Sequence, residues 1–124
     1  MMLAIRAFLL FEAVTFVVAA LIHKGFLVQG YEHAQAHVAE SIIAAVLLGG
    51  LLLTLFVTPW TRRVALIVQG FALLGTLIGI LTIIVGVGPR TVPDVVYHVA
   101  IVLVLILGIM VARRAPASVA GGFG

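Results

Sequence analysis

Cysteine is absent from this sequence, and charged residues are scarce. With no cysteine among the 124 residues, disulfides, thiolate metal sites and cysteine nucleophiles are all excluded. Only 9% of the residues are charged and 65% are hydrophobic, far from the composition of a soluble domain. Seven basic residues are too few for a nucleic-acid surface, so we expect no nucleic-acid partner. The composition predicts a small membrane protein of one domain.

Long apolar runs take up most of the chain. Four of them approach the length of about 20 residues that a helix needs to cross a bilayer, and they cover residues 3–22, 38–57, 64–85 and 95–112. Short connections between such helices are typical of an all-α, up-down-up-down four-helix bundle, which we predict for residues 1–114. Residues 115–124 are rich in small residues, and we expect them to form a flexible tail.

The positions of the basic residues predict how the helices are oriented. Five of the seven lie near one set of helix ends, and Lys24 and Arg90 lie near the other; the five are Arg6, Arg62, Arg63, Arg113 and Arg114. Because cytoplasmic loops carry an excess of Lys and Arg, we expect both termini to be cytoplasmic. The expected location is the cell membrane, specifically the inner membrane of a bacterium.

All four histidines fall on the predicted outer side. In "YEHAQAHVAESI", residues 31–42, His33, His37 and Glu40 have the i, i+4, i+7 spacing of one helical stripe. On the last helix, His98 follows Asp94 by four residues at a matching depth.

Two kinds of ligand suit histidines that converge from separate helices. Imidazole with carboxylate suits a divalent transition metal held by His37, Glu40 and His98. A pair of imidazoles suits haem b, bound by His37 and His98. The alternative is that His37 and Glu40 only solvate a helix end, with Glu40 neutralised by a neighbouring histidine. We expect His23 and His33 to be solvated interface residues, and ligand binding to survive the loss of His23.

Glu12 lies near the middle of the first apolar run. A carboxyl group at this depth is costly unless it is neutral or partnered. Gln69 and Thr76, spaced i, i+7 on the third helix, bracket the same depth, so Glu12 is interpreted either as a hydrogen-bonded lock to Gln69 or as a proton or ligand site. In "GTLIG", Gly75 and Gly79 have a spacing that lets helices approach closely, either within the chain or in a homodimer.

Three functions fit these patterns best. The first is a non-catalytic accessory or scaffold subunit of a membrane assembly, embedded in lipid and either self-associating or joined to a larger complex. The second is a haem-binding or metal-binding membrane protein that uses His37 and His98. The third is a proton-coupled carrier that uses Glu12. An intramembrane enzyme acting on a lipid or quinone is a weaker fourth, since Ser41 has no argued base beside it.

Overall fold

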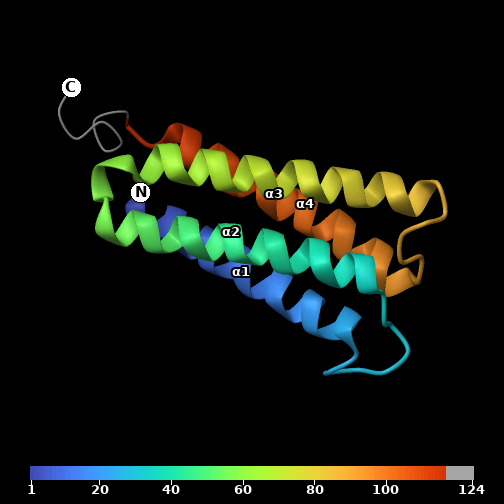
Figure 1. The fold of residues 1–124 in the computed structure, drawn as a ribbon. Coiled ribbons are helices and arrows are strands. Elements are labelled where there is room, and N and C mark those ends of the chain that lie inside the picture. Colours follow the sequence, from blue (N-terminus) through green and yellow to red (C-terminus); the bar gives the residue numbers. More distant parts are fainter. Residues whose placement is uncertain (117–124) are drawn as a thin grey trace.

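Four long helices make up nearly all of the described structure (Figure 1). The computed structural model describes residues 1–116, so the predicted tail lies almost entirely outside the described residues. The helices are α1 (Met2–Lys24), α2 (Ala34–Phe56), α3 (Thr61–Ile84) and α4 (Val92–Arg114), with a short 3-10 helix at Thr58–Trp60. Each is long and apolar enough to span a membrane, which confirms the all-helical prediction. The side on which the termini lie stays a prediction.

Two helices, α2 and α4, begin earlier than their apolar runs because polar side chains cap their first turns. The Nδ1 atom of His33 accepts a hydrogen bond from the Ala36 amide at 3.1 Å, so α2 begins a full turn before residue 38. At α4, Thr91 is the N-cap and Asp94 the reciprocal partner of a capping box. The C-terminal end of α1 is set by Gly25. Its φ of 91° is the left-handed conformation that glycine adopts readily.

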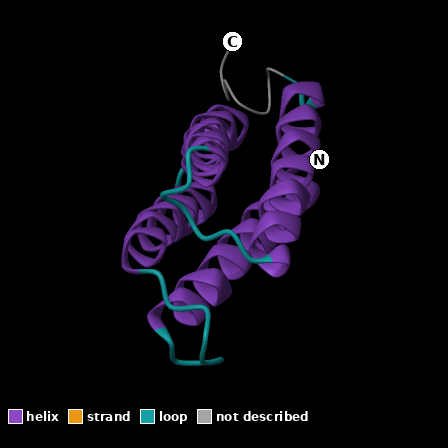
Figure 2. Ribbon diagram, turned by 90° about the vertical axis from the view of Figure 1, so that its right-hand side faces the viewer, coloured by secondary structure: helices purple, strands orange, loops and turns teal. Residues whose placement is uncertain are grey.

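Consecutive helices pack side by side and run antiparallel, with loops confined to their ends (Figures 1 and 2). The first helix also packs against the last, which closes the ring. Across the middle, α1 approaches α3, whereas no backbone contact joins the described parts of α2 and α4. In cross-section the four helices form a diamond. The helices α1 and α3 lie across its shorter diagonal and touch at the centre, whereas α2 and α4 lie across its longer diagonal and are apart.

The interior and the surface are both apolar. Buried core residues come from every helix and include Leu9, Leu47, Val68 and Leu105. Large hydrophobic side chains also cover the outside, and Leu3 and Phe56 are exposed over more than four-fifths of their surface. Such a surface would be costly in water and suits lipid or neighbouring membrane helices. The fold is that of a small membrane protein.

Two glycines of the GTLIG segment lie against helices of the same chain. A Cβ added at Gly75 would be 2.9 Å from the Ile43 side chain on α2, and one added at Gly79 would be 3.3 Å from Nε2 of His98 on α4. Gly75 and Gly79 thus let helices of the same chain approach closely. Homo-dimerisation through this segment stays a prediction.

Candidate functional site

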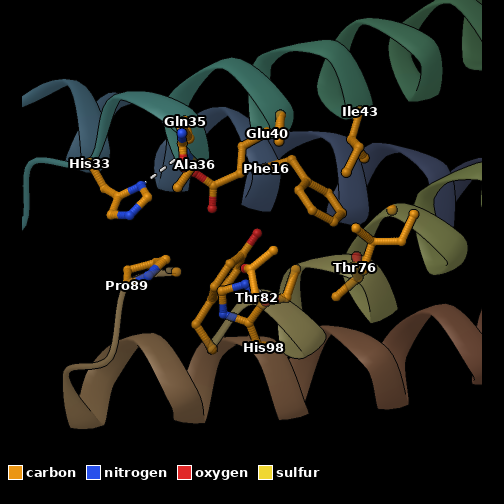
Figure 3. A pocket seen from close by; sticks show the side chains of 16 residues that line it. Phe16, His33, Gln35, Ala36, Glu40, Ile43, Thr76, Thr82, Pro89 and His98 are labelled. Atoms are coloured by element: carbon orange, nitrogen blue, oxygen red, sulfur yellow. Dashed lines mark hydrogen bonds between the residues drawn. The ribbon is translucent and has the colours of Figure 1, made fainter. Parts of the chain in front are cut away.

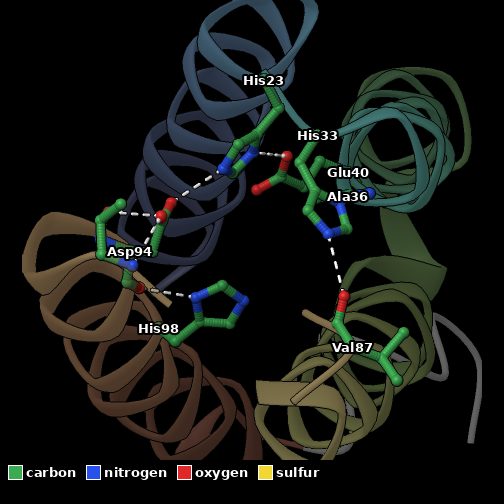
Figure 4. Close-up of polar contacts among 8 residues, drawn as sticks. His23, His33, Ala36, Glu40, Val87, Asp94 and His98 are labelled. Atoms are coloured by element: carbon green, nitrogen blue, oxygen red, sulfur yellow. Dashed lines mark hydrogen bonds and ion pairs between the residues drawn. The ribbon is translucent and has the colours of Figure 1, made fainter. Parts of the chain in front are cut away.

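A histidine bridges two carboxylates at the end of the bundle that holds the 25–33 loop (Figure 4). His23 Nδ1 lies 2.5 Å from Glu40 Oε1, and its Nε2 lies 2.8 Å from Asp94 Oδ1. The three residues are only 3%, 5% and 6% exposed, in the same order. This group, hereafter the His23 clamp, joins α1 to α2 and α4.

The hydrogen bonds of the clamp define its charges. A carboxylate only accepts hydrogen bonds, so with both acids ionised both ring nitrogens of His23 must donate, and the ring is an imidazolium. Asp94 Oδ2 accepts further hydrogen bonds from the Thr91 amide, at 3.3 Å, and from the Thr91 hydroxyl. Glu40 Oε2 is buried and has no partner among the described residues. With both acids ionised the clamp would carry one net negative charge, and its unsatisfied atom belongs to Glu40.

Our expectation for His23 was wrong. We placed this residue in solvent, beyond the end of an apolar run, but α1 continues to Lys24 and keeps His23 inside the bundle. The following loop folds back so that the His33 amide donates to the His23 carbonyl at 2.9 Å. The sequence signal for this was Gly25, a helix-stop residue two positions after His23, which places His23 in the last turn of α1 and not in the loop. Glu40 does have a histidine as a close polar neighbour, and that histidine is His23.

The other two histidines of this region make backbone contacts. His33 Nε2 donates to the Val87 carbonyl at 3.0 Å, which ties the start of α2 to the loop after α3. His37 Nδ1 donates to the Ala20 carbonyl at 2.9 Å, so its ring faces α1. Both contacts position helices and loops relative to one another.

A cavity of about 220 Å³ lies beside the clamp, between α2, α3 and α4 (Figure 3). Glu40 and His98 point into it, and His33, Thr76 and Tyr97 also line it. His98 Nδ1 donates to the Asp94 carbonyl at 2.7 Å, so in the neutral ring Nε2 is an acceptor. The Tyr97 hydroxyl is buried beside Glu40 and makes no hydrogen bond of normal geometry among the described residues.

The structure does not bring His37 and His98 into one cavity. His98 lines the cavity just described, whereas His37 lines a second one of about 350 Å³, with His23, Lys24 and Glu32. Their helices, α2 and α4, are on the longer diagonal, and α1 packs against the side of α2 that carries His37. Within residues 1–116, no group of three or more histidines and acids has an arrangement suited to a metal ion. Metal or haem binding by these residues stays a prediction without geometric support.

A second polar group lies in the middle of the bundle. Glu12 and Gln69 are fully buried, and Gln69 Nε2 donates to the Ala65 carbonyl at 3.1 Å. A Cβ added at Gly108 would lie 2.0 Å from Gln69 Oε1 and 2.6 Å from Glu12 Oε2, so both oxygens converge on this glycine of α4. Neither oxygen has a partner within the described chain. A proton on Glu12 would let it donate to Gln69, which fits the predicted lock.

Thr76 and Arg6 lie apart from this central group. Thr76 is buried, but its hydroxyl donates to the Ala72 carbonyl of its own helix at 2.7 Å. At the opposite end of the bundle, Arg6 Nη2 donates to the Thr54 carbonyl at 2.6 Å and Nε to the Thr54 hydroxyl at 3.3 Å. Arg6 therefore holds the end of α2 against α1, a role that sequence reasoning did not find.

Comparison with protein-family models, with curated proteins and with solved structures gives no match. The class is therefore defined by the fold and the buried polar groups: a small protein of four helices, each long and apolar enough to span a membrane, with polar contacts between helices at both ends and Glu12 and Gln69 buried in the middle.

Proposed function

We propose that this protein is a non-catalytic accessory or scaffold subunit of a membrane assembly. The observation that carries the proposal is the way its buried polar groups are used. The His23 clamp joins three helices at one end, Glu12 and Gln69 meet Gly108 in the middle, and Arg6 holds α2 at the other end. These contacts hold the helices in one arrangement and leave apolar faces outward for lipid and for neighbouring proteins.

The absence of cysteine gives a direct test. Single cysteines at Leu10, Leu48, Leu74 and Leu103, one exposed position on each helix, would be labelled in native membranes with a lipid-soluble maleimide. A subunit of an assembly should have at least one face that is protected in the membrane and becomes reactive after purification in detergent.

Disulfide cross-linking of the same variants identifies the neighbour. Linkage between copies at the protected face would show self-assembly, and protection without such linkage would show a different partner. Equal labelling of all four positions in membranes and in detergent would refute the proposal, because lipid alone would then surround the bundle.

A second candidate is a proton-coupled carrier, and one observation favours it. Both carboxyl oxygens of Glu12 are buried without a partner in the described structure, the arrangement expected of a group that exchanges a proton. Purified protein in liposomes with an imposed pH gradient would then conduct protons, and Glu12→Gln would not. Equal proton flux with and without the wild-type protein would exclude this function.

A further inference from the structure

The cavity beside the His23 clamp contains polar atoms that the protein itself leaves unsatisfied. Glu40 is 5% exposed, and its Oε2 atom, which the clamp does not use, has no partner among residues 1–116. The Tyr97 hydroxyl lies beside Glu40 but makes no hydrogen bond of normal geometry there. In a neutral His98 ring whose Nδ1 donates to the Asp94 carbonyl, Nε2 is an acceptor that faces the cavity. Buried polar atoms normally find a partner, so these atoms point to a ligand.

The chemistry of these atoms defines what the ligand must offer. A carboxylate oxygen and an unprotonated imidazole nitrogen only accept hydrogen bonds, whereas a tyrosine hydroxyl both donates and accepts. A ketone, ester or ether would therefore leave Glu40 and His98 unsatisfied. A ligand hydroxyl can donate to one of these acceptors and accept from Tyr97.

The size and the lining of the cavity favour an aromatic ring. An apolar cavity of about 150 Å³ is large enough to bind benzene, and this cavity measures about 220 Å³. Phe16, Ile43 and Gly75 supply apolar walls. A six-membered ring with a hydroxyl group therefore fits the space and matches its lining.

The position of the opening indicates the route of entry. Ala39 of α2 and Ile78 of α3 line the cavity and are also exposed on the outside of the bundle. Both lie within the membrane-spanning segments, where the surrounding surface is apolar. The cavity therefore reaches the lipid-facing side of the bundle between these two residues, while His33, Gln35 and Pro89 line its outer end.

We propose that this cavity binds the ring of a lipid-soluble phenol that enters from the bilayer. The ligand hydroxyl donates to Glu40 and accepts from Tyr97, and its apolar tail leaves between Ala39 and Ile78. The proposal is independent of the accessory role, because it concerns a ligand of the single chain.

The test titrates the purified full-length protein in detergent micelles with 4-hexylphenol and, in parallel, with 4-hexylanisole. Calorimetry measures binding, and protein-free micelles serve as the blank. Methylation removes the donor and leaves Glu40 unsatisfied, so we expect the anisole to bind about tenfold more weakly. Phenol without a tail should also bind more weakly than 4-hexylphenol, which separates a lipid-delivered ligand from a water-soluble one.

Matched variants locate the site. Tyr97→Phe should weaken 4-hexylphenol binding about fivefold, the effect of one neutral hydrogen bond. Tyr31→Phe, the same change outside this cavity, should leave binding unaltered. Ala39→Trp, at an exposed position outside the buried core, should close the opening and abolish binding. Equal affinity for the phenol and the anisole, or unchanged binding in Ala39→Trp, would overturn the proposal.

Discussion

Replacing His23 by alanine tests whether the clamp stabilises the fold. The substitution leaves Glu40 and Asp94 buried without the cation that now lies within 2.8 Å of both. Breaking a buried charge pair by removing one partner costs about 3–5 kcal/mol, mostly because the remaining charge is left uncompensated. We therefore expect His23→Ala to lower the free energy of unfolding in detergent by about this amount.

His37→Ala is the matched control for this prediction. His37 is only half-buried, and its contact is one hydrogen bond to the Ala20 carbonyl, worth about 1 kcal/mol. Both variants would be unfolded by denaturant in mixed micelles at neutral pH, with circular dichroism as the readout. Equal losses for the two variants would refute the reasoning, because Glu40 and Asp94 would then be satisfied without His23.

A rescue experiment separates charge from packing. Adding Glu40→Gln and Asp94→Asn to His23→Ala removes both uncompensated charges, so the triple variant should be more stable than His23→Ala alone. Such non-additivity is expected for residues in one hydrogen-bonded group. If the three substitutions simply add, the loss in His23→Ala comes from the missing ring volume.

The remaining predictions concern the centre of the bundle and its orientation. Gly108→Ala should cost about 1–3 kcal/mol of stability, because its Cβ would overlap buried oxygens of Gln69 and Glu12; Gly49→Ala, with no atom within 4 Å of its Cβ, should change stability by no more than about 1 kcal/mol and in the stabilising direction. Equal effects in thermal unfolding would contradict this. Glu12→Gln should keep the fold, whereas Glu12→Lys should lose it, as judged by gel filtration in detergent; a well-folded lysine variant would mean that Glu12 reaches water. A C-terminal reporter should be active in the cytoplasm, and activity only outside it would reverse the predicted orientation.

The four helices were predictable because a long run of apolar residues identifies a helix that can span a membrane. The start of α2 at Ala34 was missed by a turn, because the apolar pattern does not include the His33 cap. The faces of the helices were not predictable, because apolar residues surround each helix and no polar stripe distinguishes the interior from the lipid side. Spacing placed His37 and Glu40 on α2 correctly, with His33 as the N-cap just before it, but could not show that His37 turns towards α1.

The His23 clamp was missed for a related reason. Its three members come from α1, α2 and α4, and 71 residues separate His23 from Asp94. Periodicity relates residues within one helix, whereas this contact depends on the rotation of three helices about their axes. Glu12 and Gln69 were easier to associate, since each is a rare polar residue at the same depth and α1 approaches α3 across the shorter diagonal.

The distribution of the clamp over the chain has a consequence for biogenesis. His23 and Glu40 belong to the first hairpin, so this ion pair can form once α1 and α2 are inserted, before the second half of the chain leaves the ribosome. Because proteins are synthesised from the N-terminus, Asp94 arrives only with the last helix. Until then, the second ring nitrogen of His23 has no carboxylate. The docking of α4 therefore adds the contact between His23 and Asp94 to the one that His23 already makes with Glu40. We expect α1 and α2 to insert first as a stable hairpin and α4 to dock against them last.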